Sequence, residues 1–534
     1  MENNKDSTVT KDPSTTSTND NEEESGCCKC SGVRYLFVIS SFLGMCFSYA
    51  LRVNLSIAII AMVNSTAISE PNGNTNFTNV PMCGALNYPL PTSRMQIREN
   101  KTGTFIWSPK MQGVILGSFY YGYSISQIPG ARLAEIYSGK WILGFGIFIS
   151  ALLAFLIPEA AKFHTTALIV VRALQGLAQG VTFPALYNLL GRWTLEEEKT
   201  LIESFVVSGI NVGTVIGLPL AAKLTNSSWF GGWPAAFYVI GIIACVWFFF
   251  WALCITNSPA EHPCMTTKEL QHITAFQMSE HEPVPIPWLR ILTFGPFWAA
   301  VYAQFIGDWT FFLLLNNLPT FYSTILNFHI ETNGYVSSFS YVLQTIVACL
   351  SGFISDEAIK HEIVTPIVAR KTCNMLGCIG SIVGLLISSS AGCDITLQIC
   401  AFGLTMAAVG MWSCSYMISY LDISPEYAGT LIGVSSTFSG FTGFITPIFV
   451  GALTDKQPTF SQWRFIFGVT IILIISNGIV YQLFATATKQ YWDEEQHLER
   501  DARFRNYYRR LFRRKQENTN SVPKATEEKV EKNE

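Results

Sequence analysis

The sequence predicts an all-α membrane protein with twelve transmembrane helices in two six-helix halves. Three observations predict this class: the composition, a series of long apolar segments, and a polar stretch near the middle of the chain. Of 534 residues, 49% are hydrophobic and only 14% are charged, with a mean hydropathy of +0.30. Soluble domains carry roughly 25% charged residues. The composition therefore excludes an ordinary soluble protein of several domains.

The apolar segments have the length that a membrane span requires. A helix needs about 20 mostly apolar residues to cross roughly 30 Å of hydrocarbon. The runs are continuous rather than alternating, and a helix satisfies its own backbone hydrogen bonds in lipid, so we expect helices and not strands. The predicted spans are 35–63, 111–135, 141–159, 166–191, 201–222, 234–256, 293–323, 335–356, 371–390, 396–420, 428–452 and 464–486.

The longer polar segments predict how the chain is organised. The stretch after the sixth span is rich in His, Glu and Pro, and we interpret it as a cytoplasmic linker between two halves. The sequence after the last span is strongly basic, as cytoplasmic segments next to a membrane tend to be. The predicted regions are a disordered cytoplasmic N-tail (1–34), an N-terminal half (35–256), the linker (257–292), a C-terminal half (293–486) and a basic cytoplasmic C-tail (487–534).

Loops on the other side of the membrane carry glycosylation motifs. With cytoplasmic termini, the loop after the first span and the loop after the fifth span lie on the non-cytoplasmic side, where glycosylation occurs. Cys83 and Cys393 also fall on that side, where they either pair or remain free thiols. The predicted glycosylation sites are Asn64, Asn76, Asn100 and Asn226.

Three charged residues lie well inside the predicted spans: Arg52, Arg172 and Asp308. Each charge costs at least about 2.5–3.5 kcal/mol at the bilayer centre, so such residues are candidates for function. Arginine keeps its charge at any working pH, and its planar fork suits a carboxylate or a phosphate. The residues therefore indicate a cavity for anions. The alternative is an internal ion pair, such as Arg172 with Asp308, that only holds helices together.

Small residues lie beside one of these arginines. Gly176 and Gly180 follow Arg172 at four-residue spacing, and Gly209, Gly213 and Gly217 repeat the spacing in the fifth span. Such stripes let membrane helices approach closely. Glycines and a proline also interrupt the eleventh span, and interrupted helices often line a transport site.

Other classes of function are weakly supported. We find no glycine-rich phosphate loop, metal-ligand set or nucleophile–base pair, so we expect neither an enzyme nor a metal or organic cofactor. We expect a lipid bilayer as surroundings, no nucleic-acid partner, and function as a monomer. A receptor or scaffold that transports nothing stays an alternative at this point.

Several motifs resemble a known family. The fourth span carries Arg172-x-x-x-Gly176-x-x-x-Gly180, and Gly352-x-x-x-Asp356 precedes Arg370-Lys371 between the eighth and ninth spans. Both resemble motifs of the major facilitator superfamily. Within it the chain resembles the anion:cation symporters, the group of sialin, the vesicular glutamate and nucleotide transporters and the type I sodium/phosphate cotransporters. The segments that carry this likeness are Tyr49–Leu55, Gly117–Tyr123, Gln127–Gly130, Val181–Ala185, Trp309–Phe312 and Leu421–Gly429.

The resemblance implies a carrier of small organic or inorganic anions that works by alternating access and is coupled to protons or sodium. It implies residence in the plasma membrane or in a lysosomal or vesicular membrane. Two alternatives stay open, a sodium-dependent inorganic phosphate cotransporter and a carrier driven by potential or chloride. The implied substrate-binding residues are Arg52, Arg172, Tyr121, Tyr187 and Asn316, and the implied gating residues are Asp356, Arg370, Glu135 and Lys140.

Departures from the family pattern concern ion coupling. Gln179 stands where sialin-like and vesicular members have Glu, and Tyr187 stands where they have His. Glutamine cannot take up a proton, so we hypothesise that Asp308 replaces the missing acid; Gln179 and Asp308 are our ion-coupling positions. Gly307 and Leu116 replace the Arg and His of glutamate transporters, which argues against vesicular glutamate loading.

Overall fold

The computed structural model describes residues 32–64, 103–194, 199–265, 287–424, 428–455, 459–488 and 490. Within these ranges the regular structure is helical, apart from one isolated bridge between Val63 and Phe105. Most of the predicted N-tail, the first long loop, the middle of the linker and the C-tail lie outside the described residues.

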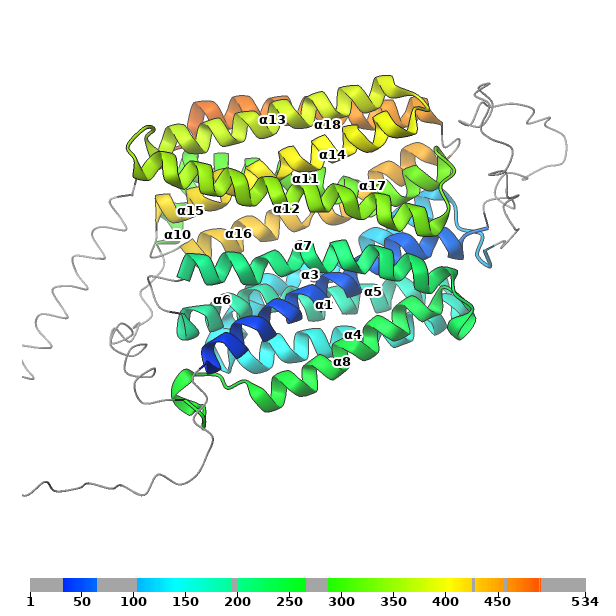
Figure 1. The fold of residues 1–534 in the computed structure, drawn as a ribbon, viewed down its shortest axis with the longest axis horizontal. Helices are drawn as coiled ribbons and strands as arrows, with labels where there is room; N and C mark the ends of the chain where they lie inside the picture. The colour runs from blue at the N-terminus through cyan, green and yellow to red at the C-terminus, as the bar shows by residue number, and fades with distance from the viewer. Residues whose placement is uncertain are drawn as a thin grey trace, which may run out of the picture.

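The helices form two groups in chain order (Figure 1). They run side by side along the long axis of the molecule, with α1 to α8 in one half and α10 to α18 in the other. The first group is α1 (Val33–Met62), α3 (Pro109–Ile136), α4 (Gly139–Phe163), α5 (Thr165–Gly180), α6 (Thr182–Trp193), α7 (Lys199–Asn226) and α8 (Pro234–Cys254). The second is α10 (Trp288–Thr293), α11 (Gly295–Thr324), α12 (Ile330–Lys360), α13 (Pro366–Ala391), α14 (Ile395–Trp412), η3 (Ser413–Met417), α15 (Ile418–Ile423), α16 (Ala428–Gly440), α17 (Thr442–Thr454) and α18 (Phe460–Phe484).

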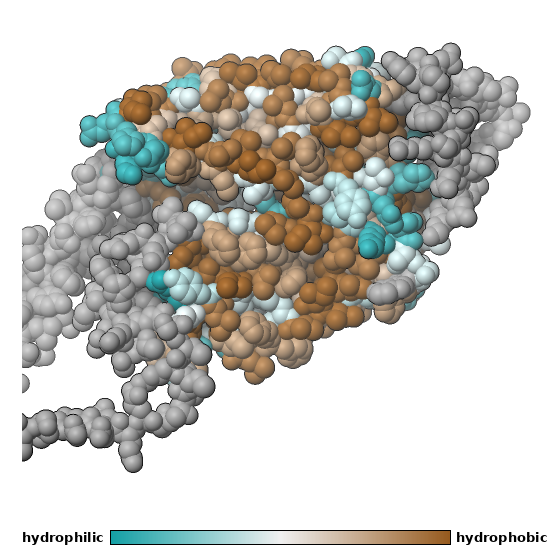
Figure 2. Space-filling model, in the orientation of Figure 1, coloured by the Kyte–Doolittle hydropathy of each residue, from teal (hydrophilic) through white to brown (hydrophobic). Residues whose placement is uncertain are grey.

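The helices account for every predicted span. Eleven spans in the described chain are long and apolar enough to cross a membrane. The second predicted span forms the 28-residue helix α3, which is not among those eleven because it is rich in Ser, Gly, Tyr and Gln. Apolar residues cover most of the described surface in Figure 2, and hydrophilic residues gather toward its two ends. This distribution matches a protein embedded in lipid.

Three of the predicted spans are interrupted. Val181 separates α5 from α6, and Phe441 separates α16 from α17. The tenth span contains a π-helical turn, η3, between α14 and α15. Such turns inside helices are frequent at functional sites. The predicted interruption of the eleventh span is confirmed, whereas the π turn has no signal in the sequence.

Glycines pack the helices of the first half closely. A Cβ added at Gly176 of α5 would lie 1.7 Å from the carbonyl oxygen of Phe119 in α3. A Cβ added at Gly213 of α7 would lie 2.3 Å from the carbonyl oxygen of Cys46 in α1. Both distances exclude a larger side chain without movement of the backbone. The glycine stripes therefore serve helix packing, as their spacing predicts.

The two halves meet tightly at one end, which we call the sealed end. Added Cβ atoms at Gly113 and Gly451 would lie 2.2 Å and 2.5 Å from the carbonyl oxygens of Pro447 and Pro109, so α3 and α17 touch there through backbone. Gly334 of α12 packs in the same way on α7.

Two hydrogen bonds cross between the halves at the sealed end. The Lys110 backbone N–H donates to Asp455 Oδ1 at 3.0 Å, and Asn226 Nδ2 donates to Glu331 Oε1 at 2.9 Å. The sealed end therefore joins both pairs of helices, α3 with α17 and α7 with α12.

Candidate functional site

The Arg52 side chain lies in a cage of aromatic rings. Its guanidinium carbon is 4.4 Å from the ring centre of Tyr49 on the same helix. It is 4.8 Å from Phe119, 5.8 Å from Tyr120 and 4.3 Å from Tyr123, all on α3. Arg52 is only 5% exposed. The ring faces attract the cation, each contact contributing about 0.5–2 kcal/mol.

The Arg52 charge has no counter-ion in the described part of the chain. Its Nε and Nη1 atoms are buried and lack hydrogen-bond partners there. A buried charge without a partner is destabilising by several kcal/mol. The aromatic contacts offset part of this, and the Tyr123 side chain adds a polar contact, but Nε and Nη1 stay without an acceptor among the described residues. The arrangement therefore presents unused donors that an anion would satisfy.

Arg172 lies beside this cage and is held more firmly. Its Nη1 donates to Gln175 Oε1 at 2.7 Å, and its Nη2 donates to the backbone oxygen of Arg52 at 3.4 Å. Its guanidinium carbon is 5.2 Å from the ring centre of Phe119, which both arginines therefore contact. Arg172 is 2% exposed, and its Nε lacks a partner within the described residues. The two guanidinium groups lie within electrostatic range of one another.

The alternative ion pair between Arg172 and Asp308 is not formed. The contacts of Arg172 are with α1, α3 and its own helix, whereas Asp308 lies on α11. Within the described ranges, no carboxylate comes within ion-pair distance of Arg52 or Arg172. The interpretation of these arginines as structural ion pairs therefore fails.

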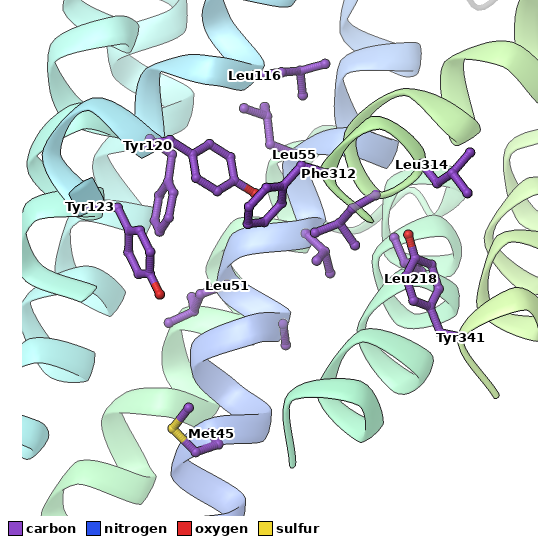
Figure 3. Packing of buried hydrophobic residues seen from close by; sticks show 14 of the residues in the cluster. Met45, Leu51, Leu55, Leu116, Tyr120, Tyr123, Leu218, Phe312, Leu314 and Tyr341 are labelled. Atoms are coloured by element: carbon purple, nitrogen blue, oxygen red, sulfur yellow. The ribbon is translucent and has the colours of Figure 1, made fainter. Parts of the chain in front are cut away.

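The second half contributes the opposite wall of this site. The Tyr120 ring lies 4.8 Å from that of Phe312 on α11, and Figure 3 shows Tyr120 reaching from α3 toward Phe312. Asn316 follows one turn later and interacts with the Tyr120 side chain; its Nδ2 is buried without an assigned hydrogen bond. Asn316 is therefore brought to the arginine site, as the resemblance implies.

Asp308 lies in a separate polar group on the second half. Its carboxylate lies beside Gln304 and Ser439, and it is within electrostatic range of Tyr49 and Tyr416. Tyr49 also lies on the guanidinium of Arg52. Tyr49 is therefore in contact with the Arg52 guanidinium and within electrostatic range of the Asp308 carboxylate. Among the described residues Asp308 forms no ion pair.

The other predicted site residues lie away from the cage. Gln179 is fully buried and ties three helices of the first half together, since its Nε2 donates to Ser48 O at 3.0 Å and to Ser150 Oγ at 2.8 Å. Tyr121 packs on Phe444 of α17 with ring centres 5.0 Å apart. Tyr187 packs on Phe183 and interacts with Glu203 of α7. Figure 3 shows Tyr120 and Tyr123 beside α1.

The predicted gating residues bond within their own halves. Arg370 of α13 pairs with Asp422 of α15 at 3.1 Å, while Asp356, the other gating residue of the same motif, is exposed. The pairing with Asp422 arises because α15 returns to the start of α13, which the motif spacing alone does not indicate. Lys140 Nζ donates to the backbone oxygen of Ala252 at 2.9 Å. The Glu135 side chain lies outside the described part.

Only some of the predicted glycosylation sites and cysteines lie within the described residues. Asn64 lies at the end of α1, and Asn226 is exposed at the end of α7. Asn76, Asn100 and Cys83 lie outside the described residues. Cys393 is disulfide-bonded, and its partner also lies outside them.

Sequence reasoning missed the aromatic cage itself. Tyr49, Phe119 and Tyr123 stood in the family-like segments but were not assigned to the site. Their signal was spacing: residues 119 and 123 are four apart and share one face of a helix. Which helix they face follows only from the fold.

The fold and the buried charges define a class: a multi-pass membrane transporter whose two helical halves enclose a central site. A model of the Major Facilitator Superfamily matches residues 39–447, and the chain belongs to this superfamily. Its members transport solutes, so the prediction that the chain is not an enzyme agrees with this membership.

Individual proteins support the assignment. The chain is similar to sialin of Ovis aries, with 34% identity over 472 residues that cover 88% of this chain and 92% of sialin. It is similar to vesicular glutamate transporter 1 of Bos taurus, with 32% identity over 483 residues, 88% of this chain and 80% of the relative.

Solved structures show the same fold. A bacterial homologue of the human lysosomal transporter Spinster, in an inward-facing and occupied conformation, gives a TM-score of 0.62 at 12% identity, covering 85% of this chain and 97% of that one. A D-xylose–proton symporter gives a TM-score of 0.61 at 12% identity, covering 85% and 98%. These two likenesses concern the fold alone.

Proposed function

We propose that the protein is a cation-coupled carrier of small organic or inorganic anions that works by alternating access. The single observation that carries this proposal is the Arg52 guanidinium, buried in an aromatic cage with two unpaired nitrogen atoms and, among the described residues, no carboxylate within ion-pair distance. A second buried cation, Arg172, adds to the positive potential. An anion bound here would satisfy free donors in surroundings of low dielectric, where charge-assisted hydrogen bonds are strong.

In this proposal Arg52 contacts the anion directly, and Arg172 mainly orients it. Arg172 already uses Nη1 on Gln175 and Nη2 on the backbone of α1, so that Nε is its one nitrogen atom without a partner in the described chain. Asn316 and Tyr120 would supply neutral polar contacts from the two halves. Tyr121 and Tyr187 would line the path rather than the site, because their contacts lie elsewhere.

Asp308 is the proposed coupling residue. It is a carboxylate without an ion-pair partner in the described chain, it is partly buried, and it lies within electrostatic range of Tyr49 of the arginine cage. Uptake of a proton or sodium would compensate its charge. Gln179 cannot exchange protons and is fully buried, so at that family position we assign it the role of holding α1, α4 and α5 together.

The sealed end is proposed to be the non-cytoplasmic end. It carries the end of α1 with Asn64 and the end of α7 with Asn226, which are two of the predicted glycosylation sites. The opposite end carries the start of α1. The described state would then be closed to the outside or lumen, with glycans on the loops there and residence in the plasma membrane or in a lysosomal or vesicular membrane.

The test is reconstitution of the full chain into liposomes. Uptake of labelled phosphate, sialate, urate and aspartate is measured under separately imposed pH, sodium and voltage gradients. We expect uptake of at least one of these anions to be driven by a pH or sodium gradient and to be lost in Arg52→Gln. Uptake that follows only the membrane potential would favour the facilitative carrier. Uptake confined to phosphate with sodium would identify the alternative cotransporter, to which the same two arginines are suited.

A further inference from the structure

A glutamine one turn before Asp308 is the centre of a hydrogen-bonded group. Gln304 is 4% exposed. Its Oε1 accepts from Tyr420 Oη at 2.9 Å and from Ser435 Oγ at 2.6 Å. Its Nε2 donates to Ser436 Oγ at 3.4 Å and to Ser439 Oγ at 3.3 Å. Both ends of the amide are therefore used, and the partners come from α15 and α16.

The two ends of this amide have different surroundings. Ser439 and Gln304 both lie beside the Asp308 carboxylate, and they are bonded to each other. Ser435 lies one turn earlier on α16 and bonds Tyr420 and Gln304, and among the described residues it forms no hydrogen bond to the carboxylate. The Gln304 group therefore has one hydroxyl that faces Asp308 and a comparable hydroxyl that does not.

Ser439 is also next to a contact between the halves. The following residue, Gly440, packs on Ser124 of α3, and an added Cβ there would lie 2.6 Å from Ser124 Oγ. Ser124 Oγ is buried without a partner in the described chain. Further along, Gly443 packs on the ring of Tyr120, a member of the arginine cage. One segment of α16 and α17 thus connects the surroundings of Asp308 with the first half.

We propose that Gln304 is a positioning residue for ion coupling: it holds Ser439 against Asp308, so that the gain or loss of a cation there moves α16 where it packs on α3. The proposal rests on the proposed function, which assigns coupling to Asp308. Tyr49, Tyr416 and Tyr420 are the titratable groups that face this region from α1, η3 and α15.

The physical basis is the direction of the Ser439 hydroxyl. Ser439 Oγ donates to Ser436 O at 3.2 Å and accepts from Gln304. An ionised carboxylate accepts hydrogen bonds, whereas a protonated one also donates. A bound sodium ion instead requires an oxygen lone pair. Either cation therefore changes the hydrogen bond or lone pair that Asp308 and its ion require from the Ser439 hydroxyl. The hydroxyl meets this change by reorienting relative to Ser436 and Gln304.

The experiment compares Ser439→Ala with the matched control Ser435→Ala. Each removes one hydroxyl of α16 that bonds Gln304, but only the first removes a neighbour of Asp308. The purified full-length protein is melted at increasing NaCl in a choline chloride background, and separately across pH 5–8 without sodium. A cation that binds the folded protein raises the melting temperature in a saturable way. The readout is the half-saturating sodium concentration or the midpoint pH of this rise.

We expect Ser439→Ala and Gln304→Leu to shift the half-saturating cation concentration at least threefold, and Ser435→Ala to shift it less than twofold. Ser439→Thr, which keeps the hydroxyl, should show the wild-type dependence of the melting temperature on the cation. This variant provides a second measurement if the alanine variant folds poorly. Gly440→Ala should slow uptake of the four labelled anions without moving the half-saturation, because it disturbs the contact with α3 and not the carboxylate.

The outcomes separate this inference from the proposed function. Equal shifts in Ser439→Ala and Ser435→Ala would make Gln304 a structural hub only and would overturn the inference. No shift in either variant, together with loss of the cation dependence in Asp308→Asn, would overturn it while leaving Asp308 as the coupling residue. An unchanged dependence in Asp308→Asn would overturn the coupling assignment and this inference with it.

Discussion

Replacing Arg52 with glutamine should remove anion binding while leaving the fold intact. A buried arginine in an ion pair behaves differently, because removing it leaves its partner's charge buried and uncompensated, which destabilises the protein. Arg52 has no such pair in the described chain, and two of its nitrogen atoms have no acceptor. The substitution keeps a polar amide on a shorter side chain and removes the charge and the planar fork.

The two effects can be estimated separately. A hydrogen bond to a charged group contributes about 1.5–3 kcal/mol, so losing a two-pronged contact with an anion should weaken binding by about 2–4 kcal/mol. That corresponds to roughly a 30- to 1,000-fold rise in the dissociation constant. For stability, the loss of cation–π contacts of about 0.5–2 kcal/mol each is offset by relief of the uncompensated buried charge. The free energy of unfolding should therefore change by less than about 2 kcal/mol in either direction.

The assay measures uptake at increasing anion concentration in liposomes and thermal unfolding in detergent. Arg172→Gln is the control, because this substitution leaves Gln175 Oε1 without its 2.7 Å donor. It should therefore destabilise the fold by about 1–3 kcal/mol as well as slow transport. Unaltered uptake by Arg52→Gln would refute the reasoning. So would a loss of stability in Arg52→Gln as large as that in the control, since it would mean that the guanidinium has a structural partner.

Three further predictions concern packing and the ends of the molecule. Gly176→Ala should prevent α5 from approaching α3, because its Cβ would lie 1.7 Å from a backbone oxygen; loss of the monodisperse peak in size-exclusion chromatography checks this. Asp422→Asn should leave the buried Arg370 charge without its ion-pair partner and lower the free energy of unfolding by at most about 3–5 kcal/mol. Asp422 is 19% exposed, so water screens the pair and reduces this loss; thermal melting measures it. Glu331→Gln should weaken the hydrogen bond from Asn226 that helps to close the sealed end. A cysteine placed at the central site should then react faster with an impermeant thiol reagent applied from that side, and an unchanged rate would contradict the prediction.

The fold could be predicted because lipid imposes length and hydropathy on each span. Twelve apolar runs gave twelve helices, including α3, whose polar residues keep it outside the eleven most apolar spans. The polar residues of α3 do not contradict its assignment as a membrane span. They point to the interior, where Tyr120, Tyr123 and Ser124 meet α1, α11 and α16. A helix that lines a site departs from the lipid pattern for that reason.

The site could be predicted only at its charged residues. Burying Arg52 in a span has a large cost, and this alone marked it as functional. Its surroundings could not be predicted, since the cage depends on which face of α3 turns toward α1. The same limit explains the Arg370 pairing: the motif placed Asp356 nearby in sequence, but the fold brings in Asp422 from a helix some fifty residues away. Spacing in the sequence therefore indicates which charged residues are candidates for a site, whereas helix packing determines which residue each of them pairs with.

The placement of charge gives a reason why an anion and a cation should move together. Arg52 and Arg172 belong to the first half and Asp308 to the second, and none of them forms an ion pair in the described chain. An anion alone would compensate one arginine if monovalent, or both if divalent, and would leave the carboxylate uncompensated, while a cation alone would compensate the carboxylate and leave both arginines uncompensated. Either singly loaded state would keep an unpaired charge in a region of low dielectric, which is unfavourable by several kcal/mol. Tyr49 lies on the Arg52 guanidinium and within electrostatic range of Asp308, so the two sites are linked through one side chain of the first half. The state with both ions bound is therefore the one in which the least charge is left uncompensated when the halves move.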